Sequence, residues 1–218
     1  MRNLIKKIAT PVLKKIHNWY FSKPRKYYYK DSFVWVHPNV FPPHFTISTK
    51  IFLNFINDLD VKNKTFLELG CGSGIISIHA AKKGAFVTAS DINKDALNQL
   101  KINSKLNTVT ISIVYSNLFE NLNDLFFDYI VINPPYYPKK PVNDKEKAWF
   151  CGENYEYFYF LFQQLQAQLI NKSKCYMILS EDCHIEKIQK IASEFHINFL
   201  LTLSMKKSLE KNYIYLLH

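Results

Sequence analysis

The sequence has few glycines, no closely spaced cysteine pair and no long apolar run. Glycine accounts for only five of 218 residues, and the four cysteines form no Cys-x-x-Cys motif and no zinc-type spacing with histidine. We therefore expect no metal site, and four reduced thiols as in a cytoplasmic protein. No stretch approaches the roughly 18 apolar residues of a membrane span, and the N-terminus lacks the apolar core of a signal peptide. A membrane span and a disulfide framework are thus excluded by the sequence.

Basic residues, in contrast, are concentrated at one end. The formal net charge is +10, and residues 1–30 hold nine Lys or Arg and no acid, which leaves 19 basic and 18 acidic residues elsewhere. Apolar residues between Leu4 and Trp19 fall on one helical face. We therefore predict a basic amphipathic arm over residues 1–32 and one folded domain over residues 33–218. The arm is expected either to pack on the domain or to bind nucleic acid or an acidic protein surface.

Apolar strands and amphipathic helices alternate along the folded domain. This alternation is typical of a mostly parallel sheet with helices on both faces. The connection 205–211 is too short for a crossover helix, so the last two strands are expected to pair antiparallel. Helices are predicted over residues 48–59, 74–83, 94–106, 154–170 and 184–195, and strands over 33–36, 65–69, 86–90, 110–115, 127–132, 174–179, 197–203 and 212–217.

Three of the five glycines lie in Glu68-Leu69-Gly70-Cys71-Gly72-Ser73-Gly74, between a predicted strand and a predicted helix. Nucleotide-type ligands bind at this place in open α/β sheets. A dinucleotide fingerprint would need glycine where Ile75 stands. The acidic-x-Gly-x-Gly-x-Gly pattern instead resembles motif I of the class I S-adenosylmethionine-dependent methyltransferases. The resemblance implies S-adenosylmethionine as cofactor and a Rossmann-like fold, with a mostly parallel seven-stranded sheet and an antiparallel C-terminal hairpin.

The glycine loop and the next strand end are expected to hold the cofactor. The resemblance implies that Gly70, Cys71, Gly72 and Gly74 contact its carboxypropyl and ribose parts, and that Glu68 orders the loop or meets the methionine amino group through water. Asp91 ends the following strand, 21 residues after Gly70. Its carboxylate can accept hydrogen bonds from both ribose hydroxyls. The alternative is that Asp91 caps the next helix, a role also open to Asn93.

The adenine end is expected near two strand ends. Ile92 is placed to lie against the adenine ring, and Leu118 and Phe119 to add apolar contacts. Methyltransferases often carry Asp where Asn117 stands, accepting from the adenine amino group. The amide oxygen of Asn117 is also able to accept this hydrogen bond.

The strand over 127–132 runs into Asn133-Pro134-Pro135-Tyr136, which looks like motif IV of the amino-methyltransferases. These enzymes modify exocyclic amines of bases or side-chain amides of proteins. A planar, conjugated NH₂ group is a poor nucleophile, and two acceptors, the Asn133 side-chain oxygen and the Pro134 carbonyl, can each hold one N–H and orient its lone pair. Tyr136 can stack on the planar target, and Asn133 is also expected to contact the cofactor.

Two softer segments narrow the resemblance to the glutamine N5-methyltransferases that act on translation release factors. Ala148-Trp149-Phe150-Cys151-Gly152-Glu153-Asn154 is similar to their A-W-x-G-G element, with Cys151 in place of the first glycine. Val40–Thr46 is similar to their proline-bearing segment, without its usual acidic residue. The resemblance covers about residues 34–200, with the arm outside it.

The sequence therefore predicts an S-adenosylmethionine-dependent N-methyltransferase whose catalytic domain is residues 33–218. Its expected acceptor is a glutamine of a release factor or ribosome-associated protein. The basic arm favours the alternative acceptor, an exocyclic amine of RNA or DNA (adenine N6 or guanine N2). A non-catalytic, cofactor-binding adaptor is a third alternative, but cofactor retention alone would not require the Asn133–Tyr136 clamp.

Overall fold

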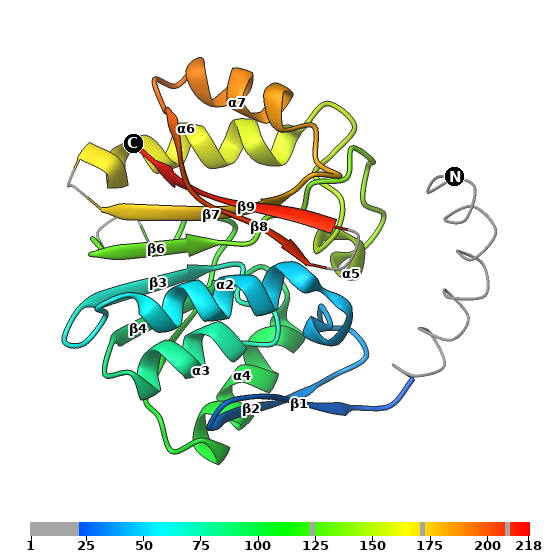
Figure 1. The fold of residues 1–218 in the computed structure, drawn as a ribbon. Coiled ribbons are helices and arrows are strands. Elements are labelled where there is room, and N and C mark those ends of the chain that lie inside the picture. Colours follow the sequence, from blue (N-terminus) through cyan, green and yellow to red (C-terminus); the bar gives the residue numbers. More distant parts are fainter. Residues whose placement is uncertain (1–21, 123–124, 171–172, 208–209) are drawn as a thin grey trace.

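The computed structural model describes residues 22–122, 125–170, 173–207 and 210–218. Its centre is a seven-stranded sheet in the order β5-β4-β3-β6-β7-β9-β8 (Figure 1). Strands β3 to β7 pair in parallel, whereas β9 pairs antiparallel with both β7 and β8. The strands are β3 (Thr65–Leu69), β4 (Phe86–Asp91), β5 (Ser112–Tyr115), β6 (Tyr129–Ile132), β7 (Lys174–Ser180), β8 (Phe199–Lys207) and β9 (Glu210–Leu217).

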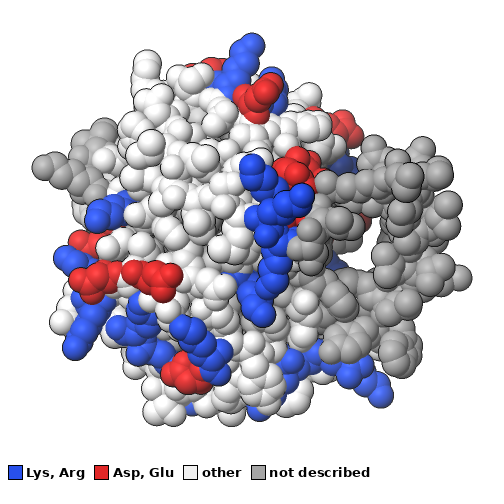
Figure 2. Space-filling model, viewed as in Figure 1, with Lys and Arg blue, Asp and Glu red and all other residues white. Residues whose placement is uncertain are grey.

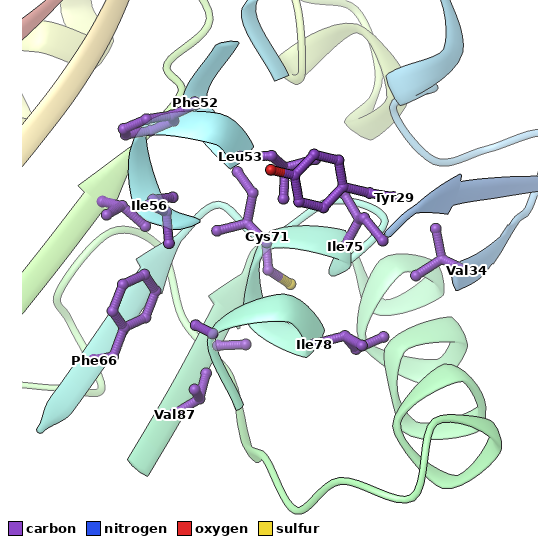
Figure 3. Packing of buried hydrophobic residues seen from close by; sticks show 14 of the residues in the cluster. Tyr29, Val34, Phe52, Leu53, Ile56, Phe66, Cys71, Ile75, Ile78 and Val87 are labelled. Carbon is purple, nitrogen blue, oxygen red and sulfur yellow. The ribbon is translucent and has the colours of Figure 1, made fainter. Parts of the chain in front are cut away.

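Helices cover both faces of this sheet. On one face lie α2 (Ile47–Asp58), α3 (Ile75–Lys82) and α4 (Lys94–Leu106), and on the other lie α6 (Glu156–Ile170) and α7 (Ile185–Ser193) (Figure 1). Each layer has its own apolar cluster. Because successive side chains of a strand point to opposite faces, Phe66 packs with Phe52 in the first cluster (Figure 3), whereas Leu67 belongs to the second, with Phe158.

A small antiparallel hairpin, β1 (Arg25–Tyr29) and β2 (Ser32–Val36), packs against α3 and α4. Two asparagines of α4 bind the backbone of β2 as a neighbouring strand would. Asn103 accepts from the Trp35 amide and donates to its carbonyl, both at 2.9 Å. Asn107 does the same with Phe33, at 3.1 and 2.7 Å. These bonds fix the hairpin, and with it the start of the loop that leads to α2.

The predicted alternation of strands and helices is confirmed, with shifts at some ends. β3 and α4 have the predicted bounds, and β8 and β9 form the predicted antiparallel pair, longer than expected because they run to Lys207 and from Glu210. Two elements too short for a periodicity signal were not predicted: the 3-10 helix η1 (Pro43–Phe45) and α5 (Asp144–Lys147). β1 falls within the segment that the sequence assigned to the arm, and the helix predicted between Leu4 and Trp19 lies outside the described residues. Among the described residues, none of the helices is long and apolar enough to cross a membrane.

Candidate functional site

A cavity of about 730 Å³ opens where β3, β4, β5 and β6 end, within the size range of small-molecule sites. One wall is built by the loops that follow these strands, and the facing wall by the β2–α2 loop and the segment 140–160. Every residue predicted to bind cofactor or acceptor lines this cavity except Gly74 and Phe119. The lining set comprises Glu68, Gly70, Cys71, Gly72, Asp91, Ile92, Asn117, Leu118, Asn133, Pro134 and Tyr136.

The glycine loop takes its shape from the left-handed backbone conformation of its glycines and from hydrogen bonds to β4. Gly70, Gly72 and Gly74 have φ of 75°, 48° and 74°. The amides of Gly70 and Cys71 both donate to the Ser90 carbonyl at 2.9 Å. Gly74 is the N-cap residue of α3 and does not line the cavity. A Cβ added to it would lie 2.3 Å from Cδ1 of the fully buried Leu100. Gly74 therefore shapes the loop, whereas Gly70 and Gly72 face the cavity.

Glu68 lies beneath the loop and connects β3 to α3. Its carboxylate accepts from the Ser77 amide at 2.8 Å and also contacts the Ser77 hydroxyl. Burial raises the pKa of Glu68 to about 8, with a smaller contribution from the charge of Asp91 in the same direction. The carboxyl group is therefore largely protonated at neutral pH, and it can order the loop without placing a full charge under it.

Both carboxylate oxygens of Asp91 accept hydrogen bonds from backbone amides. Oδ2 accepts from the Gly72 amide at 2.8 Å and Oδ1 from the Asn93 amide at 2.8 Å. Asn93 itself caps α4, accepting from the Asp95 amide at 2.9 Å. The helix-capping alternative for Asp91 is thus not what the structure shows. Burial raises the pKa of Asp91 from its ordinary value, and both oxygens retain lone pairs for further donors.

The β5 end supplies an acceptor and an apolar side chain. Nδ2 of Asn117 donates to Glu120 Oε1 at 2.7 Å, so the amide is oriented with Oδ1 as its acceptor. Half-buried Leu118 lines the cavity. Phe119, expected to add an apolar wall, is instead fully buried in the second cluster and does not line the cavity. The prediction for Phe119 was wrong, because the turn after β5 points its side chain into the protein.

Asn133, Pro134 and Tyr136 follow β6 directly. The half-buried Asn133 side chain makes no hydrogen bond to any described residue. Tyr136 packs its ring against Tyr137, with centroids 4.8 Å apart. Burial raises the pKa of Tyr136 well above its ordinary value, so the phenol stays protonated and does not act as a base.

The segment after this loop folds back alongside it. The Tyr137 amide donates to the Trp149 carbonyl at 3.1 Å, and the Cys151 amide donates to the Tyr137 carbonyl at 3.0 Å. The two motifs that resemble those of known methyltransferases, Asn133–Tyr136 and Ala148–Asn154, therefore lie side by side. Gly152 closes the segment with φ 90°, where a Cβ would lie 1.9 Å from Glu156 Oε2.

Sequence reasoning missed part of the facing wall. Phe41, Tyr157 and Phe160 line the cavity, and Phe41 packs on Trp149 with ring centroids 4.6 Å apart. The proline-bearing segment Val40–Thr46, which was singled out in the sequence, contains Phe41. Tyr157 and Phe160 carried no signal, because aromatic residues at helical spacing look like core residues in a chain that is 16% aromatic.

The sequence and the fold are similar to those of known methyltransferases. A protein of Methanocaldococcus jannaschii named "Putative protein N5-glutamine methyltransferase" is 47% identical over 104 residues, which are 47% of this chain and 50% of that protein. The chain thus spans half of this relative. An E. cuniculi Mtq2–Trm112 complex, described as responsible for methylation of the eRF1 translation termination factor, matches with TM-score 0.61 and 18% identity over 81% of this chain and 96% of that one.

A T. thermophilus 16S rRNA N2 G1207 methyltransferase, solved with AdoMet and guanosine, matches with TM-score 0.62 and 16% identity over 88% of this chain and 50% of that one. At such identities the solved structures establish the fold. The family model for the methyltransferase small domain matches residues 31–150, more than half of the chain. The chain therefore belongs to the methyltransferase small domain family.

Proposed function

We propose that the chain transfers a methyl group from S-adenosylmethionine to the side-chain amide nitrogen of a glutamine in another protein. The observation that carries this proposal is the state of Asn133. Its amide lies at the cavity beside Pro134 and makes no hydrogen bond within the described residues. Its amide oxygen is therefore available to accept a hydrogen bond from a group bound in the cavity. A planar amide with two N–H groups is a ligand that fits.

The residues at the other end of the cavity fit the cofactor. Asp91 keeps lone pairs for the ribose hydroxyls, and Asn117 keeps Oδ1 for the adenine amino group. Ile92 and Leu118 supply apolar surface for the ring, and Gly70 and Gly72 allow close approach of the backbone. When bound, S-adenosylmethionine supplies a methyl group on a positively charged sulfur, which needs no further activation.

The chain's own task is to prepare the acceptor nitrogen. In an amide, the nitrogen lone pair is delocalised into the carbonyl group. The Asn133 oxygen and the Pro134 carbonyl each accept one N–H, which fixes the nitrogen and stabilises the positive charge that develops on it as the N–C bond forms and the S–C bond breaks. The sulfur leaves as a neutral thioether, and the nitrogen releases one proton to water. Positioning of this kind accounts for up to about 7–11 kcal/mol of barrier reduction in favourable cases.

Charge on the facing wall of the cavity favours a protein amide over a nucleic-acid base. The charged residues of this wall are Asp144, Glu153 and Glu156, with Lys140 and Lys147, and Lys147 is paired with Asp144 at 2.8 Å. A base in RNA or DNA brings flanking phosphates, which require a positive surface. The facing wall has no excess of positive charge, and the M. jannaschii relative named for glutamine methylation agrees with this assignment.

The test uses tritiated S-adenosylmethionine, the purified chain and an extract of cells that lack it. We expect the label in protein, removed by protease and not by nuclease, and mass spectrometry should place one methyl group on a glutamine. Label removed by nuclease would contradict the proposal. Asn133→Ala is the control: it should abolish transfer while calorimetry shows nearly unchanged S-adenosylmethionine affinity, because the clamp holds the acceptor.

A further inference from the structure

A second cavity of about 590 Å³ lies beside the first, and the proposed function does not use it. It is bounded by β1, the η1–α2 junction and the end of β8. Pro43 lines both cavities, so a ligand in the second lies next to the first. The described residues that line it are Tyr27, Tyr28, Tyr29, Lys30, Pro43, His44, Thr46, Ile47, Lys50 and Lys207.

The charge of this second cavity is of one sign. Lys30, Lys50 and Lys207 are exposed, and none of the described lining residues is acidic. Figure 2 shows a band of Lys and Arg side chains crossing the middle of this face, where the end of β8 approaches α2 in Figure 1. Three lysines that converge from separate elements favour a ligand with several negative charges.

The aromatic and hydroxyl groups of the second cavity indicate which kind of polyanion fits it best: RNA, DNA or an acidic peptide. Tyr27 is half-buried and packs edge-on to His44 with centroids 5.2 Å apart, and His44 Nε2 lies 3.0 Å from the Lys26 carbonyl, which ties η1 to β1. Rings interleaved with lysines suit stacking on bases with phosphate contacts on either side. An acidic peptide would use the lysines but not the rings. Among the lining hydroxyls, those of Tyr29 and Thr46 are already bonded within the protein. The phenols of Tyr27 and Tyr28 can bond a 2′-hydroxyl, which DNA lacks.

From this combination we infer that the second cavity binds a single-stranded segment of RNA next to the methyl-transfer site. The lysines contact phosphates, and Tyr27 provides the stacking surface. A protein substrate bound to RNA would then be held through both of its components. The inference goes beyond the proposed function. Because RNA binding is measured without methyl donor or acceptor, the RNA-binding proposal and the glutamine-methylation proposal can be refuted independently.

The test measures binding of a fluorescein-labelled single-stranded RNA of 12 nucleotides to the full chain by anisotropy, as a function of salt. The site variant is Lys30→Gln/Lys50→Gln/Lys207→Gln. The matched control is Lys101→Gln/Lys187→Gln/Lys190→Gln, which removes the same charge from exposed positions on α4 and α7. Each lost phosphate contact reduces the slope of log K against log salt by about 0.7 for a single strand.

We expect the site variant to bind RNA at least tenfold more weakly, with a slope smaller by about 2, and the control to change both much less. Tyr27→Leu should weaken binding about tenfold and Tyr27→Phe should not. Equal losses in the two lysine variants, or no loss in either, would overturn the assignment. So would equal affinity for DNA of the same sequence, or tighter binding of a polyglutamate peptide with the same dependence on the three lysines.

Discussion

Two glycines of the cofactor loop offer a matched test of how the loop is built. Gly70 and Gly74 have nearly the same φ, 75° and 74°, so an alanine at either position meets the same backbone cost. Their surroundings differ. A Cβ on Gly70 has no heavy atom within 4 Å, whereas a Cβ on Gly74 lies 2.3 Å from Leu100 Cδ1 and 3.2 Å from Cγ.

The expected loss of stability follows from these distances. Left-handed backbone costs a non-glycine residue about 1–2 kcal/mol, and this cost applies to both variants. Any stabilisation through the unfolded chain is also common to both. Leu100 is fully buried, so any movement of its side chain disturbs the packed core, and Gly74→Ala adds an overpacking cost of about 1–3 kcal/mol. We expect Gly74→Ala to lower the free energy of unfolding by that much more than Gly70→Ala.

Urea unfolding at neutral pH measures both variants, and Leu100→Ala completes a double-mutant cycle. In the Leu100→Ala background the clash is gone, so Gly74→Ala should cost only what Gly70→Ala costs. The reasoning fails if the two glycine variants lose equal stability, or if Leu100→Ala leaves the cost of Gly74→Ala unchanged.

Three further perturbations test the site and its support. Asp91→Ala should raise the S-adenosylmethionine Kd at least tenfold, because charge-assisted hydrogen bonds contribute about 1.5–3 kcal/mol each; calorimetry showing no change would remove the ribose role. His79 is buried, and burial lowers its pKa from 6.5 to about 4. The unfolded chain therefore takes up the proton first, and this residue's contribution to stability falls by up to about 3 kcal/mol as the pH drops from 6.5 toward 4. The difference in unfolding free energy between wild type and His79→Leu should shift accordingly between pH 7 and pH 5, and a constant difference would contradict it. Asn107→Ala should release the β1–β2 hairpin, seen as faster hydrogen exchange at the Phe33 amide, with exchange of the β6 amides as the reference.

The arrangement of the main sheet and most of the residues that line the first cavity could be predicted from local sequence patterns. The alternation of apolar periods predicted β3 and α4 at their actual bounds, because strands and helices of a doubly wound sheet each carry a complete local signal. Motifs that stand at strand ends are brought together by the topology alone. The glycine loop, Asp91 and Asn133 therefore converge without any further information.

The details of the site required contacts between distant residues. Asn103 and Asn107 look like ordinary helix-surface residues in the sequence. In the structure their side chains bond the backbone of β2, as a neighbouring strand would. Trp149 meets Phe41 across more than a hundred positions, and Phe119 turns inward because the second cluster provides room for it. None of these outcomes has a periodic signature, since each depends on which surface happens to face the residue.

The glycines of the loop show the same difference between what the sequence predicts and what only the folded structure shows. Their spacing in the sequence predicted a binding loop for a methyl donor and argued against a dinucleotide site. Only the packed structure separated Gly70 and Gly72, which face the cavity, from Gly74, which faces Leu100. The second cavity is likewise a product of packing, because Lys30, Lys50 and Lys207 come from three elements that meet only in the folded chain. Local backbone preference acts over a few residues, whereas burial and charge convergence depend on the whole fold.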